Sequence, residues 1–217
     1  RSHGAWPKHE YLKPWIVDQC LMAVIDVGIN IGQFLYFAYR LWPDVKIIGI
    51  EPTADLADKM PFLYKHDTRV VVGASAASDH AGEATFHITR NSQNSSLLGP
   101  SDRFVADRPD DGLLRTETVQ LRHMDDILKD ETGPFFVKTV VQGVEMEVLR
   151  GFGDRLADIE TLIVEAPFEE AYDVDGGFDN IYRYLADRGM DDAGPLGTLT
   201  SKKTGRVRQE DAVFVKR

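Results

Sequence analysis

Five residues between positions 26 and 51 have the types and spacing of a nucleotide-binding loop. Asp26 lies in an apolar run, Gly28, Asn30 and Gly32 follow at alternate positions, and Glu51 ends the next apolar run. Glycines in such a loop permit a tight turn and let backbone come close to a ligand at a helix N-terminus. An acid about 20 residues further on accepts hydrogen bonds from ribose hydroxyls in these folds. The segment therefore predicts a ligand that contains a ribose.

Asp26 and Asn30 favour a cationic ligand over a dinucleotide. A dinucleotide-binding loop has glycine at its middle position so that pyrophosphate can touch the backbone, and this chain has Asn30 there. Asp26 would repel pyrophosphate but would attract an amino group or a sulfonium. S-adenosyl-L-methionine has both of these cations and a ribose, so it is the cofactor that the loop predicts. An ordinary α/β turn with a chance acid is the alternative, because such turns are common.

A second group of polar residues, in the C-terminal half, has side chains that could move a proton. Lys138 lies within an apolar run, Gln142 follows that run, and Glu165 ends the next one. A buried lysine or glutamate can act as a general base, and Gln142 could orient a substrate hydroxyl. His123 belongs to this group because imidazole titrates near neutral pH. Lys138 could instead pair with an acid, and His123 could be a surface or structural residue.

Three other features have competing interpretations. Asp79 could reach an adenine ring, although its Asp-His-Ala-Gly sequence is typical of a turn. Glu145 begins a predicted helix, where an acid also stabilises the helix dipole. Asn94 to Ser96 lie in a polar segment, 89–116, of a length typical of a functional lid or a mobile loop. These residues could cap the cofactor or contact the substrate, or they could belong to a plain flexible loop.

The candidate residues need a sheet whose strands end at one edge. Apolar runs predicted as strands alternate with helical runs, which indicates an α/β fold with a mostly parallel central sheet and helices on both faces. Strands are expected at 24–27, 46–50, 70–72, 84–88, 119–121, 135–141, 160–164, 196–200 and 212–215, and helices at 33–41, 54–66, 125–128, 143–149 and 178–188. Ligands bind outside the carboxyl ends of the strands in such sheets, so the candidates are predicted to meet there.

Composition predicts a soluble globular protein with one α/β domain. The chain has 217 residues, of which 43% are hydrophobic and 28% charged. We expect residues 1–20 to form an N-terminal arm that packs on a domain of residues 21–217; residues 1–4 could be left over from expression. The net charge of −10 disfavours a general nucleic-acid binder, and no apolar run is long enough to span a membrane. One cysteine and no signal-peptide core fit a cytoplasmic location.

Seven segments, taken in order, resemble the FkbM family of S-adenosylmethionine-dependent methyltransferases. They are DVGINIGQF (26–34), IEP (50–52), ASAASDHAGEATF (74–86), NSSLL (94–98), VQLRHMDDIL (119–128), FVKTVVQGVEMEVLRG (136–151) and QEDAVFVKR (209–217). The resemblance implies a Rossmann-like class I methyltransferase fold with a C-terminal antiparallel strand. It also implies methyl transfer to a hydroxyl of a sugar or a secondary metabolite, with a small hydroxylated acceptor as partner.

One position departs from the family pattern. The family commonly has Asp where this chain has Val140, and valine can neither accept a proton nor hold a polar substrate group. The departure also disfavours metal-assisted transfer, and no metal is expected. It leaves open a catalytically impaired protein that keeps the cofactor. An NAD-binding oxidoreductase is a separate alternative, against which Asp26 and Asn30 argue.

Overall fold

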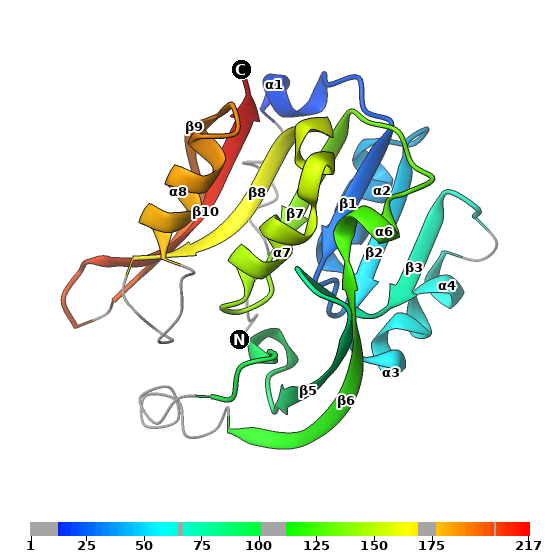
Figure 1. Cartoon of the computed structure of the whole chain (residues 1–217), viewed down its shortest axis with the longest axis vertical. Helices are drawn as coiled ribbons and strands as arrows, with labels where there is room; N and C mark the ends of the chain where they lie inside the picture. Colours follow the sequence, from blue (N-terminus) through cyan, green and yellow to red (C-terminus); the bar gives the residue numbers. More distant parts are fainter. Residues whose placement is uncertain (1–12, 65–66, 101–111, 169–176, 202) are drawn as a thin grey trace.

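The chain folds into two sheets of different size. The computed structural model describes residues 13–64, 67–100, 112–168, 177–201 and 203–217. One sheet has seven strands in the order β3-β2-β1-β7-β8-β10-β9, and the other has three in the order β4-β6-β5 (Figure 1).

The seven-stranded sheet is parallel except at one strand. Its strands are β1 (Ala23–Val27), β2 (Lys46–Glu51), β3 (Val70–Ala74), β7 (Phe135–Thr139), β8 (Ile159–Pro167), β9 (Met190–Thr200) and β10 (Val207–Lys216). The pairs β2–β3, β1–β2, β1–β7 and β7–β8 are parallel, whereas β10 runs antiparallel to both β8 and β9. The predicted class, with its C-terminal antiparallel strand, is confirmed.

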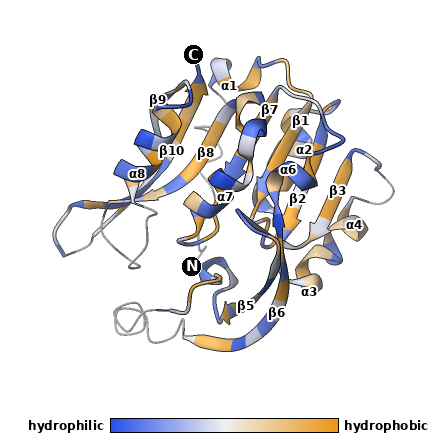
Figure 2. Ribbon diagram, in the orientation of Figure 1, coloured by the Kyte–Doolittle hydropathy of each residue, from blue (hydrophilic) through white to orange (hydrophobic). Residues whose placement is uncertain are grey.

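Helices cover both faces of this sheet because successive strand residues point to opposite sides. Val24 packs with Phe34 and Leu35 on one face, and its neighbour Ile25 belongs to the core that includes Leu149 on the other. The first face carries α1 (Pro14–Val17), α2 (Gln33–Leu41) and α4 (Lys59–Leu63); the second carries α6 (Met124–Ile127), α7 (Glu145–Gly151), the 3-10 helix η4 (Gly153–Asp158) and α8 (Phe178–Ala186). Figure 2 shows hydrophobic residues along β1 and β2 and hydrophilic residues on α7 and α8.

The three-stranded sheet was not expected from the sequence. It consists of β4 (Ala76–Ser78), β5 (Gly82–Thr89) and β6 (Leu113–His123), with the 3-10 helix η2 (Ser92–Asn94) after β5. The strand predicted at 119–121 begins at Leu113, so the segment 89–116 is not all loop. Antiparallel hydrogen bonding to β5 holds the first half of β6, where most side chains are exposed and apolar residues do not alternate with polar ones.

The helix predicted at 54–66 is two short helices. α3 (Ala54–Ala57) and α4 are separated by Asp58, and residues 65–66 lie outside the described residues. Pro61 falls in the first turn of α4, where its missing N–H costs no helical hydrogen bond. A single helix running through position 61 would lack the hydrogen bond that proline cannot donate. The first helix therefore ends at Ala57, and a second begins at Lys59.

Gly151 allows α7 to approach the second sheet, and its replacement tests that contact. A Cβ at this position would overlap the carbonyl oxygen of Ser78 in β4. Alanine normally stabilises a helix by about 1 kcal/mol relative to glycine. We expect Gly151→Ala to lower the free energy of unfolding by about 1–3 kcal/mol instead, because overpacking outweighs the helix gain. Urea unfolding followed by circular dichroism measures the change.

Gly73→Ala in β3 is the matched control for this substitution. A Cβ at Gly73 would meet no atom within 4 Å, so the free energy of unfolding should change by less than about 0.5 kcal/mol. Equal effects of the two substitutions would show that the close approach at Gly151 does not matter for stability.

Candidate active site

A cavity of about 690 Å³ opens at the carboxyl ends of β1, β2, β7 and β8. Its volume is in the range of small-molecule sites. The strand ends contribute Gly28, Glu51, Val140 and Glu165 to its lining, and the three-stranded sheet contributes Phe86. The structure thus brings together, at one edge, most of the residues that the sequence singled out.

The loop after β1 turns through three residues with positive φ. Gly28 and Gly32 both have φ +79°, and Asn30 has φ +53°. A Cβ at Gly28 would overlap the carbonyl oxygen of Val140, so only glycine lets β1 end so close to the backbone that follows β7. Gly32 is the N-cap of α2 and is not part of the cavity lining.

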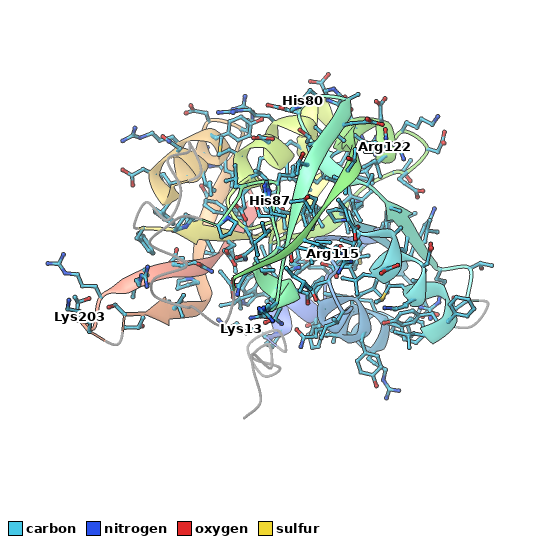
Figure 3. All side chains as sticks on the ribbon, turned by 90° about the horizontal axis from the view of Figure 1, so that it is seen from below. Lys13, His80, His87, Arg115, Arg122 and Lys203 are labelled. Atoms are coloured by element: carbon cyan, nitrogen blue, oxygen red, sulfur yellow. The ribbon has the colours of Figure 1, made fainter. Side chains whose placement is uncertain are left out.

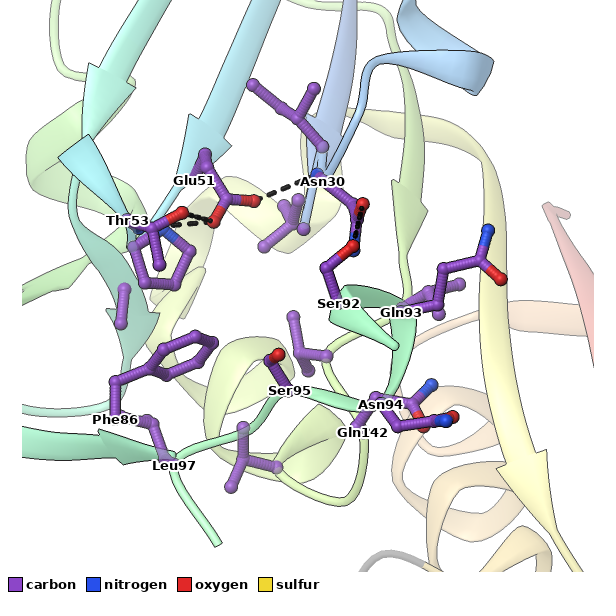
Figure 4. Close-up of a pocket in the computed structure, with 18 of the residues that line it drawn as sticks. Asn30, Glu51, Thr53, Phe86, Ser92, Gln93, Asn94, Ser95, Leu97 and Gln142 are labelled. Atoms are coloured by element: carbon purple, nitrogen blue, oxygen red, sulfur yellow. Dashed lines mark hydrogen bonds between the residues drawn. The ribbon is translucent and has the colours of Figure 1, made fainter. Parts of the chain in front are cut away.

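Glu51 is held by backbone and hydroxyl donors at the end of β2. Its Oε2 accepts a hydrogen bond from the Asn30 N–H at 2.8 Å, and its Oε1 accepts from the Thr53 N–H at 3.1 Å and the Thr53 hydroxyl at 2.7 Å (Figure 4). These bonds to a charged acceptor are of the stronger kind and fix the carboxylate beside the loop. The sequence did not indicate Thr53, although its place two residues after the acid suits such a bond.

Asp26 and Lys138 form a buried ion pair behind the loop. The Lys138 Nζ lies 3.0 Å from Asp26 Oδ1 and donates to the Gly28 carbonyl oxygen at 3.1 Å. Burial raises the pKa of Asp26, and Lys138 opposes that rise. Asp26 is fully buried and does not line the cavity, so the expected direct attraction between Asp26 and a cationic ligand gains no support. Lys138 lines the cavity, but its ammonium is bound to Asp26 and the loop.

Gln142 and Glu165 form a second polar pair in the cavity. The Gln142 Nε2 donates to both carboxylate oxygens of Glu165, at 2.9 and 3.0 Å. Gln142 has φ +61°, which non-glycine residues adopt rarely. Burial raises the pKa of Glu165 well above its usual range; the carboxylates of Glu145 and Asp211 add to the rise, and the Gln142 bond and Lys138 oppose it.

Glu145 holds the turn that contains Gln142. Its two carboxylate oxygens accept hydrogen bonds from the N–H groups of Val141 and Gly143, at 3.1 and 2.9 Å. Burial raises the pKa of Glu145, and these backbone bonds oppose the rise. The geometry therefore supports the structural reading of Glu145, as a residue that shapes the turn.

The segment around η2 contacts both the loop after β1 and the turn that contains Gln142. The Ser92 hydroxyl donates to Asn30 Oδ1 at 3.0 Å, as Figure 4 shows, and the buried Ser96 hydroxyl donates to the Gln142 carbonyl oxygen at 2.8 Å. Asn94 also lines the cavity. Of the predicted segment 89–116, this part is ordered against the cavity, and residues 101–111 lie outside the described residues.

The second sheet gives the cavity an apolar wall that the sequence did not reveal. Phe86 and Ile88 of β5 line the cavity together with Leu97, and all three belong to or pack on the small core of that sheet. Figure 4 shows Phe86 next to Thr53 on the β2 side of the cavity, with Leu97 beyond Phe86. No local motif could have predicted this wall, because its position depends on how the second sheet packs on the first.

Two predicted site residues lie away from the cavity. Asp79 does not line the cavity, and its Oδ1 lies 2.8 Å from His80 Nδ1 in the turn after β4. His123 pairs with Ser78 at the last residue of β6 and does not line the cavity either. Figure 3 shows His80 near the Arg122 end of β6, away from Arg115, which lines the cavity. The roles predicted for Asp79 in adenine binding and for His123 as a base therefore gain no support.

Lys138→Met tests the buried ion pair. The substitution leaves Asp26 buried without its cation, so we expect the free energy of unfolding at neutral pH to fall by about 3–5 kcal/mol. Burial already raises the pKa of Asp26, and loss of Lys138 raises it further. A folded state with the raised pKa binds more protons than the unfolded chain, so the variant should gain stability as pH falls from 8 to 5. Chemical unfolding across this pH range measures both effects.

Lys46→Met is the matched control, because Lys46 pairs with Glu131 near the surface. Its free energy of unfolding should fall by less than about 1 kcal/mol, with little dependence on pH. The double variant Asp26→Asn with Lys138→Met should recover part of the lost stability. A small loss in Lys138→Met, no larger than in the control, would refute the central role of the pair.

No helix among the described residues is both long and apolar enough to cross a membrane. A comparison with curated proteins finds no match. Solved structures with a similar fold include that of a Klebsiella pneumoniae protein assigned as an O-methyltransferase, with a TM-score of 0.54 and 10% identity over 100% of this chain and 84% of that one. A weaker match is to precorrin-6y C5,15-methyltransferase from Geobacter metallireducens, with a TM-score of 0.40 and 12% identity over 89% of this chain and 76% of that one.

The family profile of the methyltransferase FkbM domain matches residues 26–191, which is most of the chain. The match includes the loop after β1, Glu51, the Lys138–Gln142 segment and Glu165. It confirms the predicted methyltransferase, with S-adenosylmethionine as its cofactor, and removes the oxidoreductase alternative. The chain belongs to the FkbM family of methyltransferases.

Proposed function

We propose that the chain methylates a hydroxyl group of a sugar or a secondary metabolite. The observation that carries this proposal is the place of Glu165, an acid with a raised pKa that shares one cavity with the loop after β1. Transfer to a hydroxyl needs a base, because a protonated hydroxyl is a weak nucleophile. A metabolite-sized acceptor also suits the volume of the cavity.

The residues at the β1 and β2 ends fit S-adenosylmethionine. Gly28 and Asn30 would bring backbone to the cofactor, and the fixed carboxylate of Glu51 would accept hydrogen bonds from its ribose. The apolar wall of Phe86 and Leu97 lies on the same side and would flank the adenine. When bound, the cofactor would supply the methyl group that its sulfonium carries. Transfer of that methyl would leave a neutral thioether.

Glu165 is the strongest candidate for the general base. A carboxylate with a raised pKa accepts a proton near neutral pH more readily than an ordinary one does. Gln142 donates to both of its oxygens and thereby fixes the plane of the carboxylate. The backbone of the turn that carries Gln142 is itself held by the Ser96 and Glu145 bonds. Lys138 is a positioning residue here, since its ammonium is bound to Asp26.

The valine at position 140 supports a second candidate function, that of a cofactor-binding protein with impaired catalysis. Val140 lines the cavity at the end of β7, where the family resemblance predicts an acid. If that acid were the base in this chain too, its loss would leave binding intact and remove turnover. The presence of Glu165 in the same cavity supports the active enzyme instead.

Glu51→Ala tests the ribose assignment. The substitution removes a charged acceptor, so we expect the affinity for S-adenosylhomocysteine to fall by about 1.5–3 kcal/mol in calorimetry. Glu83→Ala is the control, because Glu83 is an exposed acid of β5 outside the cavity, bound to Gln120. An unchanged affinity in Glu51→Ala would place the ribose elsewhere.

Glu165→Gln tests the base. We expect it to lower kcat by about 10²–10⁴-fold on an accepted hydroxylated substrate, while the affinity for S-adenosylhomocysteine stays the same. The activity of the unmodified chain should fall as pH drops through the raised pKa of Glu165, because the protonated acid cannot accept a proton. Glu160→Gln, on the same strand but outside the cavity, should leave kcat unchanged. A methyl-transfer screen over hydroxylated acceptors supplies the substrate.

Val140→Asp separates the two candidates. A gain of at least about tenfold in turnover, with little effect of Glu165→Gln, would assign base catalysis to an acid at position 140. Loss of turnover in Glu165→Gln without a gain in Val140→Asp supports the active enzyme. If none of the proteins turns over any acceptor while all bind the cofactor, the impaired protein is the better description.

A further inference from the structure

Gln142 keeps an uncommon backbone conformation, and both sides of the peptide that follows it are held. Its φ of +61° lies in the left-handed region, which non-glycine residues keep only where the surrounding structure holds them. The peptide between Gln142 and Gly143 is planar, so its carbonyl and its N–H turn together. The carbonyl accepts from the Ser96 hydroxyl at 2.8 Å, and the N–H donates to Glu145 Oε2 at 2.9 Å. These two bonds fix the direction in which the Gln142 side chain leaves the backbone.

The second sheet fixes the hydroxyl of Ser96. Ser96 and His87 of β5 exchange both of their backbone hydrogen bonds, at 2.8 and 3.1 Å. The Ser96 hydroxyl oxygen accepts from the Leu98 N–H at 3.0 Å, and its one proton goes to the Gln142 carbonyl. Ser96 is only 1% exposed, so bulk water does not compete for these bonds. The place of this hydroxyl is therefore set by β5 and not by the turn that it contacts.

We propose that Ser96 is a positioning residue for the base: by holding the Gln142 carbonyl, it directs the Gln142 amide onto Glu165. The Gln142 Nε2 donates to both carboxylate oxygens, at 2.9 and 3.0 Å, so a rotation of the turn would break at least one of these bonds. The inference rests on the proposed function, because it takes Glu165 as the group that removes the acceptor's proton. It goes further by giving the second sheet a part in the chemistry at the end of β8.

The Gln142 bond favours the charged form of Glu165 and so lowers the pKa of that carboxyl, against the effect of burial. The other charged groups at this end of the cavity come from three elements: Lys138 of β7, Glu145 of α7, and Asp211 and Arg208 of β10. Loss of the Ser96 bond leaves these groups in place but loosens the amide, so the pKa of Glu165 should rise further. Less of the carboxylate is then ionised at neutral pH, and fewer molecules can take the proton.

Ser96→Ala tests this role, with Ser78→Ala as its matched control. Ser78 is an equally buried serine of the second sheet, and its hydroxyl bonds to Glu147 outside the cavity. We expect Ser96→Ala to lower kcat at neutral pH by about 3- to 30-fold, while the affinity for S-adenosylhomocysteine stays within about twofold. The acid limb of its pH–rate profile should move to higher pH. Ser78→Ala should change neither, and Ser96→Thr, which keeps the hydroxyl, should keep kcat within about threefold.

A double-mutant cycle with Gln142→Gly shows whether Ser96 acts through Gln142. Glycine accepts the positive φ, so this substitution removes the amide without straining the turn. Adding Ser96→Ala to Gln142→Gly should then change kcat by less than about twofold. Independent effects that multiply would overturn the inference, as would equal effects of Ser96→Ala and Ser78→Ala. If Ser96→Ala does not fold, Ser96→Cys, whose thiol is a weaker donor, replaces it in every comparison.

A direct titration separates this inference from the proposed function. The carboxyl carbon of Glu165 is followed by NMR in protein that is isotope-labelled at its glutamate carboxyl groups, with Glu165→Gln to assign the signal, and no turnover is needed. A pKa of Glu165 that is higher in Ser96→Ala than in the unmodified chain, with no methyl transfer to any acceptor, would uphold the positioning of the carboxylate and count against the proposed methylation. An unchanged pKa would overturn the inference even if hydroxyl methylation is found.

Discussion

The ammonium of Lys138 binds the carboxylate of Asp26 and the carbonyl oxygen of Gly28 together, and the geometry of the site depends on this junction. Asp26 and Lys138 are paired in register on the parallel strands β1 and β7, so the two side chains leave the sheet side by side. Each charge would be costly if it were buried alone. Their pairing ties the end of β1 to β7 and fixes the loop that follows.

From this junction, hydrogen bonds extend to both ends of the cavity. Toward β2, the Asn30 N–H meets Glu51, and Asn30 Oδ1 accepts from Ser92. Toward β8, the turn after β7 is shaped by Glu145, and Gln142 reaches Glu165. The segment from Ser92 to Ser96 touches both ends, so the second sheet and the first form one site.

The sequence predicted the parts of the structure that follow from local patterns. Alternating apolar and helical runs predicted the α/β class, and glycines with a following acid predicted the loop after β1 and the position of Glu51. It did not predict contacts set by strand register or by the packing of one sheet on another. Lys138 was expected to pair with an acid, but the choice of Asp26 depends on the alignment of β1 with β7. The wall that includes Phe86 depends on packing in the same way.

The contact between Gly28 and residue 140 is made by backbone on both sides. This contact therefore constrains the path of the chain after β7 and sets no requirement on the side chain at position 140. That side chain projects into the lining of the cavity, where valine and aspartate have similar volumes and opposite polarity. A position that is structurally indifferent and chemically exposed can change during evolution without an intermediate that fails to fold. At position 140, a change of polarity is therefore compatible with the close approach of the two backbones.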